Sequence, residues 1–490
     1  MKISRFLLAP AALSLLAGCA VGPDFERPAA PEVKGYAPEP LPAETKSTDI
    51  PGGAAQHFAE GRDIAAQWWE VFHSEPLNRL IEQALKANPD LKAAEAALRA
   101  AEHNLSAAEG AFFPTVTPSF TPQRLKNAVQ PSPTLSSYTP YFNFFSAQVS
   151  VSYVLDVWGG TRRAVETAAA QAEAQRFQTE AAYLTLTANL VGAAVQEASL
   201  RGQIAATQRL IAIDGEAASV LRKQFELGQV ARADVAAQET ALAQAEAALP
   251  PLRKQLAVQR DLLAALGGHF PSERTEAGFD LDQLNLPAEL PVSLPSQLVE
   301  HRPDIRMAEA NLHAATAEVG VAIANMLPQL SLSGNDGTVA TKLGGLFQPY
   351  NGFWTLGANL AQTLFDGGVL LGKERASWAL LDQAGAQYRS TVITAFQNVA
   401  DTLHALEEDA NAVKANAAAE HAARESLDIV RRQMELGSVN YLAVITAEQS
   451  FQQANLNLVQ SRATRYADTA VLFQALGGGW WNRENAVSTK

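Results

Sequence analysis

The sequence holds few residues that could do chemistry together. Cys19 is the only cysteine, which excludes an internal disulfide framework and any cysteine-based metal site. The eight histidines are scattered, and no two lie closer than twelve positions, so the sequence has no His-x-x-x-His pair for zinc. It also has no G-x-S-x-G elbow and no phosphate-binding loop. We therefore expect neither an enzyme nor a bound metal or cofactor.

The remaining carboxylates have structural explanations. Asp156 and Asp366 flank glycines at the ends of two predicted strands, where a carboxylate commonly caps a turn or a helix. Glu173, Glu180 and Glu407 fall in predicted helices and are expected on a solvated face.

The N-terminus reads as a secretory signal. Lys2 and Arg5 precede an apolar run, residues 6–17, which is too short for a bilayer span of roughly 20 residues. Leu-Ala-Gly directly before Cys19 resembles the lipobox of bacterial lipoproteins, in which the thiol is acylated. Ala20, where an Asp would favour the inner membrane, indicates the outer membrane by the same resemblance. A plain signal peptide with an incidental cysteine is the alternative.

Charge excludes one class of partner. The chain carries a net charge of −13, which becomes more negative once Lys2 and Arg5 leave with the signal, so nucleic acid is not expected. No later segment is apolar enough for a transmembrane helix, and a membrane crossing would have to use β-strands.

An internal repeat organises the rest of the chain. Asn88-Pro89-Asp90 matches Arg302-Pro303-Asp304 at an offset of 214, and the match continues without a gap to Pro114 and Pro328. In both copies apolar residues recur at alternating three- and four-residue steps, which predicts a helix with a coiled-coil seam.

Both copies then change to a period of two. Strands are predicted after each proline, at 115–121, broken by Pro118, and at 329–333. Second strands at 147–153 and 354–360 alternate apolar and polar residues. Such strands suit a barrel wall with apolar groups toward lipid, although a half-buried soluble sheet fits the same alternation.

A long helix is predicted after each second strand. Proline-free stretches run from Gly160 to Gly228 and from Gly368 to Gly437, each long enough for a helix of about 100 Å. Average globular helices have only about 11–12 residues. Shorter return helices follow, and Pro250-Pro251 predicts a break or kink in the first of them.

The repeat supplies four strands per chain, which cannot close a barrel. Small membrane barrels begin at about eight strands, so the chain must oligomerise, and cyclic symmetry is the simple route. Three copies would give twelve strands, but the strand count alone does not select three over two or four.

From about Trp68 to Gly478 the chain resembles the outer membrane factor family, the TolC-like efflux channels, and especially its OprM- and NodT-type lipoproteins. The motifs that carry the resemblance are Cys19, Trp68-Trp69, Pro76-Leu77, the two Pro-Asp repeats, Leu364-Phe365-Asp366-Gly367-Gly368 and the paired Leu-Gly turns. The resemblance implies a mixed fold: a trimeric twelve-stranded outer-membrane β-barrel, continuous with a long periplasmic α-helical coiled-coil barrel.

The resemblance also implies a function. Such a homotrimer is the channel of a tripartite efflux system, passively conducting drugs or other small molecules from an inner-membrane pump to the exterior. An export duct of a type I protein secretion system is the alternative. A periplasmic adaptor is expected to contact the helix tips, at Leu227, Gly228, Val230, Leu436, Gly437 and Val439. Each Leu-Gly also fits a plain helix cap.

One carboxylate stands where the family often places a pore gate. Asp234 lies six residues after Gly228, whereas the matching stretch 441–446 of the second copy has no carboxylate. Three copies of Asp234 could form one acidic ring, or each could complement the dipole at the start of a helix.

The sequence divides accordingly. The expected segments are a signal peptide (1–18), a lipidated Pro-rich strap (19–67), a first repeat (68–268), a linker (269–295), a second repeat (296–478) and a tail (479–490).

Overall fold

The computed structural model describes residues 20–33, 35–126, 141–273 and 278–483. Cys19 and the predicted signal peptide lie outside these residues. The chain forms two compact units. Unit 1 takes Met1–Pro28, Leu98–Ala174 and Ala308–Tyr388, and unit 2 takes Ala29–Ala97, Gln175–Met307 and Arg389–Lys490.

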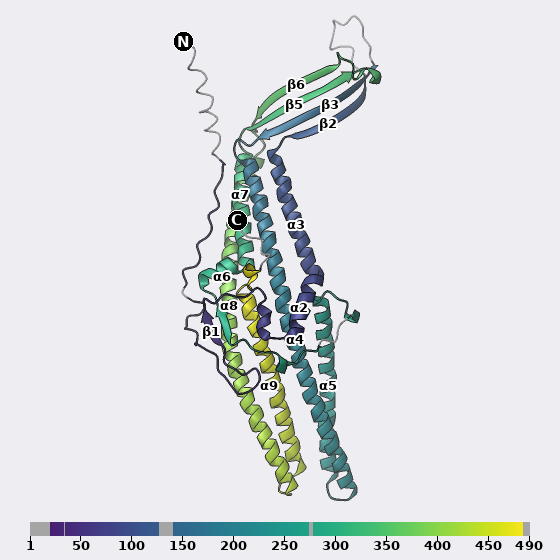
Figure 1. Ribbon diagram of the computed structural model, residues 1–490, viewed down its shortest axis with the longest axis vertical. Coiled ribbons are helices and arrows are strands. Elements are labelled where there is room, and N and C mark those ends of the chain that lie inside the picture. The colour runs from purple at the N-terminus through teal and green to yellow at the C-terminus, as the bar shows by residue number, and fades with distance from the viewer. Residues whose placement is uncertain (1–19, 34, 127–140, 274–277, 484–490) are drawn as a thin grey trace. The chain divides into compact units, whose positions relative to one another are not determined.

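Unit 1 contains a four-stranded antiparallel sheet (Figure 1). Its strands are β2 (Thr115–Lys126), β3 (Tyr141–Leu155), β5 (Gln329–Ala340) and β6 (Gly352–Ala361). They pair in the order β2-β3-β5-β6, so the strands of the two repeats meet where β3 pairs with β5. The prediction of two strands from each repeat is confirmed.

The predicted break at Pro118 is wrong. β2 runs through both Pro118 and Pro122 and stays in register with β3 over its whole length. Among the described residues β2 pairs with β3 alone, so its two prolines interrupt no second ladder within the chain. The two prolines are four residues apart, so they take equivalent positions along the strand.

The helices before the strands differ in burial. α3 (Pro89–Glu109) and α7 (Pro303–Ala324) carry the two predicted seams. In α7, Ile305, Ala308 and Val319 of the seam are buried, whereas in α3 only Leu91 is. The apolar side chains of the seam are thus partly buried in the second repeat and largely exposed in the first.

The two long helices are equal. α4 (Gly160–Glu226) and α8 (Val369–Glu435) have 67 residues each, and the return helices α5 (Arg232–Leu266) and α9 (Tyr441–Ala475) have 35 each. Among the described residues, none of the helices is both long enough and apolar enough to cross a membrane.

Of the break or kink predicted at Pro250-Pro251, the break is wrong, because α5 continues through both prolines. Two prolines remove two backbone donors but leave the rest of the ladder. Burial of Ala245 and Leu249 before them, and of Leu263 and Ala264 after them, holds both halves of this helix in place.

The core of unit 2 gathers aromatic side chains from both ends of the sequence. A 3₁₀ turn (Trp68–Phe72) and α2 (Glu75–Ala87) come from the first repeat. Trp68 is fully buried and stacks on Phe473 of α9, with ring centroids 5.3 Å apart. A second contact joins Phe177 of α4 to Trp480, edge to face at 5.7 Å.

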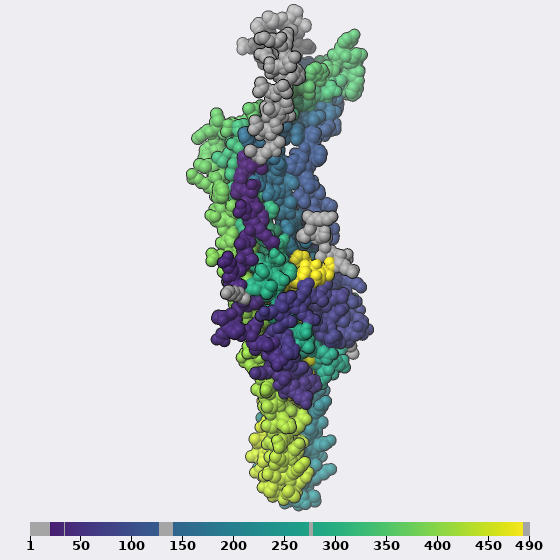
Figure 2. Space-filling model, turned by 60° about the vertical axis from the view of Figure 1, so that its left-hand side comes forward, coloured from purple at the N-terminus to yellow at the C-terminus, as the bar shows by residue number. Residues whose placement is uncertain are grey.

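Residues 29–67 of the Pro-rich strap and the linker also belong to this unit. β1 (His57–Glu60) pairs in parallel with β4 (Glu289–Val292), and α6 (Pro295–His301) follows β4. The purple N-terminal residues lie on the surface of the chain (Figure 2).

Arg465 of α9 fixes the strap. Its buried guanidinium donates hydrogen bonds to Thr45 Oγ1 (3.0 Å), Gln56 Oε1 (3.2 Å) and the carbonyl oxygens of Gly52 (3.1 Å) and Ala54 (2.8 Å). Polar groups removed from water need hydrogen-bond partners, and the one guanidinium supplies a donor to all four of these acceptors.

We predict that Arg465→Leu releases the strap. The change leaves four acceptors without their donor, and removing one partner of a buried charged network costs about 3–5 kcal/mol. Thermal unfolding of the detergent-extracted protein and limited proteolysis near residues 45–60 measure the effect. Arg432→Leu, at an exposed position of α8, is the control and should change stability by less than about 0.5 kcal/mol. Equal protease resistance of both variants would contradict the assignment.

Candidate functional site

The sheet of unit 1 has one polar and one apolar face. Directly paired residues share a face, and one row across the four strands is Thr117, Ser150, Asn335 and Thr355. Asn335 Nδ2 donates to Thr355 Oγ1 at 3.1 Å within this row. The adjacent row, on the other face, is Val116, Val151, Gly334 and Leu356.

The apolar face is open to its surroundings. Trp354 is 72% exposed and Leu356 is 80% exposed, although both are large and apolar. Exposed apolar patches of this kind mark contact with another apolar medium or surface. Asp336 is an exception on the apolar face, where it pairs with Val149 on one side and Trp354 on the other.

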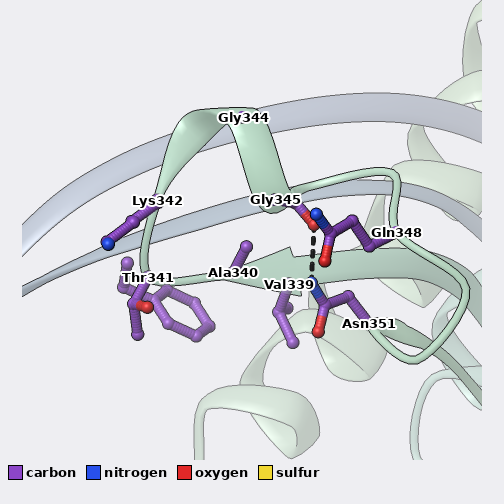
Figure 3. A pocket seen from close by; sticks show the side chains of 9 residues that line it. Val339, Ala340, Thr341, Lys342, Gly344, Gly345, Gln348 and Asn351 are labelled. Carbon is purple, nitrogen blue, oxygen red and sulfur yellow. Dashed lines mark hydrogen bonds between the residues drawn. The ribbon is translucent and has the colours of Figure 1, made fainter.

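The connection between β5 and β6 encloses a small hollow (Figure 3). Asn351 Nδ2 donates to the Gly345 carbonyl oxygen at 2.6 Å, and the Val339 amide donates to the Asn351 carbonyl oxygen at 2.9 Å. Lys342 is the one charged side chain among the described residues that line the hollow. A single ammonium without an acid or base beside it gives the hollow no catalytic set.

The two hairpin tips have the same pattern of backbone hydrogen bonds. At the first tip the Gly228 amide donates to the Phe225 carbonyl (2.9 Å) and the Gln229 amide to the Gln224 carbonyl (2.8 Å). At the second, the Gly437 amide donates to Met434 (3.0 Å) and the Ser438 amide to Gln433 (2.9 Å). This is a Schellman cap, and both glycines take the required positive φ of 73° and 70°.

The caps explain the glycines but not the leucines. Leu227 is 72% exposed and Leu436 is 84% exposed, each at the end of a hairpin. Val230 and Val439 are half-buried beside them. The cap geometry itself does not require an apolar side chain at either position.

Asp234 has a local partner. Its carboxylate Oδ2 accepts a hydrogen bond from the Ala231 amide at 3.1 Å, at the start of α5. At the equivalent start of α9, Asn440 Oδ1 accepts from the Ala443 amide at 3.2 Å. Each tip therefore caps its return helix with a different side chain, which accounts for the missing carboxylate in the second copy.

The first described residues of the chain are held on unit 1. Arg163 of α4 is buried and donates to Asp24 (2.5 Å), to Glu166 (2.8 Å) and to the Val21 carbonyl (3.3 Å). Glu166 in turn contacts His313 Nε2 at 2.8 Å. The Glu166 pKa is lowered, because its hydrogen bonds to Arg163 and His313 outweigh the opposing effect of its partial burial.

Two glycines allow this segment to approach closely. A Cβ on Gly320 would lie 2.7 Å from the Val21 carbonyl oxygen, and a Cβ on Gly159 would lie 2.6 Å from Cα of Ala20. Gly159 also has a φ of 78°, which suits glycine. The position of Ala20, the neighbour of Cys19, is thus fixed at the start of α4.

The other singled-out carboxylates are mostly structural. Asp156 accepts from the Thr161 and Arg162 amides, and Asp366 accepts from the Gly368, Val369 and Leu370 amides, so both cap helices as predicted. Glu180 differs from its prediction. It is largely buried and paired with Arg483, and burial raises its pKa.

The described residues contain no group of three or more His, Cys, Asp or Glu side chains placed to hold a metal ion.

Comparison with known proteins identifies the family. The profile described as "Outer membrane efflux protein" matches residues 80–269 and 294–478. The pyoverdine export outer membrane protein OpmQ of Pseudomonas aeruginosa is 29% identical over 445 residues, which cover 89% of this chain and 92% of that protein. The probable efflux pump outer membrane protein TtgC of Pseudomonas putida is 28% identical over 478 residues, covering 96% and 94%.

Solved structures agree. The outer-membrane channel OprN has a TM-score of 0.83 at 26% identity, over 94% of this chain and 100% of that chain. The MtrE outer membrane channel of Neisseria gonorrhoeae has a TM-score of 0.79 at 25% identity, over 94% and 99%. The chain therefore belongs to the outer membrane efflux protein family.

Membership confirms the predicted resemblance and fold class. The fold has long helices, a two-fold internal repeat and four strands per chain, with a barrel that forms only in the trimer. The family consists of outer-membrane channels with a periplasmic helical part and not of enzymes.

We predict that Asp234→Ala loosens the start of α5. The change removes a capping acceptor, a loss that typically costs about 0.5–2 kcal/mol. Hydrogen exchange of residues 229–237 should become faster, whereas Asn440→Ala should affect only the start of α9. Unchanged exchange in Asp234→Ala, with altered conductance, would favour the gate over the cap.

Proposed function

We propose that the chain is the outer-membrane channel of a tripartite efflux system and acts as a homotrimer. Three sheets would form a twelve-stranded barrel, and the long helices a periplasmic duct. The channel would passively conduct drugs or other small molecules delivered by an inner-membrane pump. The observation that carries the proposal is the sheet, with one apolar face, one polar face and two unpaired edges.

The edges argue for more than one subunit. Among the described residues, β2 and β6 each have a strand neighbour on one side only. Unpaired backbone groups in lipid cost several kcal/mol each, so a strand from another subunit must cover them. Pairing β6 of one copy with β2 of the next closes the ring by cyclic symmetry.

The helices offer matching surfaces. The seam of α3 is largely uncovered, and α8 exposes Leu371, Trp378 and Leu380. Neighbouring copies of the chain would bury these apolar side chains, since a coiled-coil seam is stable only against a partner helix.

The exposed leucines at the tips suit a protein partner. We assign Leu227, Gly228 and Val230 of the first tip, with Leu436, Gly437 and Val439 of the second, to contacts with a periplasmic adaptor. The glycines set the turn, and the leucines supply apolar area for docking.

The channel would not select transported molecules of one chemical class. Hydroxyl and amide side chains on the polar face offer hydrogen bonds without a shaped pocket. Related proteins carry names that refer to pyoverdine export, antibiotic efflux and toluene efflux. We therefore assign the choice of substrate to the pump.

Cys19 supplies a lipid anchor in this proposal. Ala20 packs against Gly159 at the start of α4, directly after β3, so an acylated Cys19 would lie near the base of the strands. A lipid there supplements the strands as a membrane attachment, because acyl chains bind reversibly whereas a closed barrel does not leave the bilayer.

Deletion of the gene tests the function. We expect drug susceptibility to rise, and the wild-type gene to restore resistance. Leu227→Lys with Leu436→Lys should fail to restore it while the trimer still forms, because charged tips would weaken adaptor binding by at least about tenfold. Gln255→Lys, at an exposed position of α5 away from the tips, is the control that adds a charge without changing them. Unchanged susceptibility together with loss of a secreted protein would instead indicate a type I export duct.

The lipid has its own test. With a cleavable signal, Cys19→Ser should lose incorporation of labelled palmitate yet still yield outer-membrane trimers, although fewer. Membrane fractionation and native electrophoresis give the readout. Complete loss of membrane-bound trimers would show that the lipid, and not the barrel, is the principal anchor.

A further inference from the structure

A buried polar cluster lies where the two helical hairpins of unit 2 meet. Each helix contributes one side chain, Asp214 from α4, Gln238 from α5, Arg431 from α8 and Glu448 from α9. Gln238 Nε2 donates to Asp214 Oδ1 (3.0 Å) and to the Asp214 carbonyl (3.1 Å). Arg431 donates to Glu448 Oε1 at 2.8 Å. Asp214, Gln238 and Glu448 are each at most 5% exposed.

The cluster lacks a hydrogen-bond donor. Gln238 Oε1 and Glu448 Oε2 are buried and accept no hydrogen bond from the described residues. A buried acceptor left in this state costs about 1–3 kcal/mol. A proton on Glu448 would make it a donor to the carboxyl group of Asp214, with which it is in hydrogen-bond contact.

The charges point the same way. Two buried carboxylates and the partly exposed guanidinium of Arg431 leave a net negative charge when both acids are ionised, and one added proton cancels it. Burial is the main cause that raises the pKa of both Asp214 and Glu448, and the opposing effect of Arg431 on Glu448 is smaller. Tyr441, at the start of α9, also faces the pair. Burial and the two carboxylates raise its pKa, so it stays neutral.

We propose that Asp214 and Glu448 share one proton and form a latch between the two hairpins of a subunit. While the proton is held, α4 and α9 stay together. When it is lost, two adjacent buried carboxylates repel each other and the hairpins separate. The inference rests on the proposed function, in which the hairpin tips close the periplasmic end of the channel.

The direction with pH follows from the raised pKa values. A group whose pKa is raised in the latched state stabilises that state fully at low pH, and the stabilisation is lost as the pH rises through the raised value. The latch is therefore closed in acid and released toward alkaline pH.

A second carboxyl pair must be separated from this one. Asp409 of α8 and Asp468 of α9 interact, and burial together with Asp468 raises the Asp409 pKa to about 7. Both residues belong to the same hairpin, so their repulsion cannot drive the two hairpins apart. Asp409→Asn is thus a control that removes a titrating acid without touching the latch.

The test follows the purified channel as the pH is raised stepwise from acid to alkaline values. The first readout is the frequency of opening in planar bilayers. The second is the distance between spin labels at Gln229→Cys and Ser438→Cys, one on each tip, in trimers with one labelled subunit. Because the pKa of both carboxyl groups is raised in the latched state, the wild type should open more often, and the label distance should lengthen, as the pH rises.

The variants separate the outcomes. Glu448→Gln and Asp214→Asn should keep the short label distance and rare opening at every pH, whereas Asp409→Asn and the exposed Glu216→Gln should behave as wild type. A pH response that survives in Glu448→Gln, or that disappears in Asp409→Asn, overturns the latch. A wild-type protein whose label distance responds to pH but which conducts at no pH supports the latch and overturns the proposed function.

Discussion

Hydrogen bonding at the edges of the β2-β3-β5-β6 sheet is the constraint on which the rest of the subunit depends. Every backbone donor and acceptor at membrane depth needs a partner, and four strands leave two edges open. The internal repeat supplies the strands in two pairs, and β3 with β5 joins them over eleven registered positions, from Phe145 with Ala340 to Leu155 with Leu330. Only other subunits can complete the ring, which is why each helix leading to or from the strands must also present a surface to a neighbour. The uncovered seam of α3 and the exposed apolar residues of α8 follow from the same requirement.

Much of this fold could be predicted because its signals are local. Alternation over a few residues located the strands, proline-free stretches between glycines located α4 and α8, and the repeat reinforced each assignment by giving it twice. The wrong predictions arose where contacts with residues distant in sequence outweighed a local rule. β2 continues through Pro118 and Pro122 because it pairs with β3 along its whole length and has no second strand partner among the described residues of the chain, which sequence does not reveal. Pro250 and Pro251 are tolerated because buried residues on both sides hold the helix. Glu180 looked solvated because its partner, Arg483, lies about three hundred positions away.

The site shows the same division. The Leu-Gly turns were visible in sequence because a helix end has a local code, and the Asp234 cap lies three residues from its partner. The residues that hold the strap were not visible. Arg163 meets Asp24 across 139 positions and Arg465 meets Gln56 across 409, and neither pair belongs to a periodic pattern. Asp214 and Glu448 come from different repeats, and although Glu239 occupies the position equivalent to Glu448, the position equivalent to Asp214 is Ala423. A repeat describes what two halves have in common, whereas the contacts between the halves need residues that differ.

The unequal helix starts at the two tips have a consequence for assembly. In a trimer the six tips would share one backbone geometry, because both Schellman caps are alike. The charge beside the tips would differ, since Asp234 lies beside the first tip of each subunit and the neutral Asn440 beside the second. The closed end of the channel would then have sixfold symmetry in its backbone shape but only threefold symmetry in its charge. A partner ring that recognises shape alone can dock in two rotational settings, whereas a partner that also senses charge has a single setting. The internal repeat provides the symmetry of the backbone, and the different capping side chains at the two helix starts distinguish the two settings.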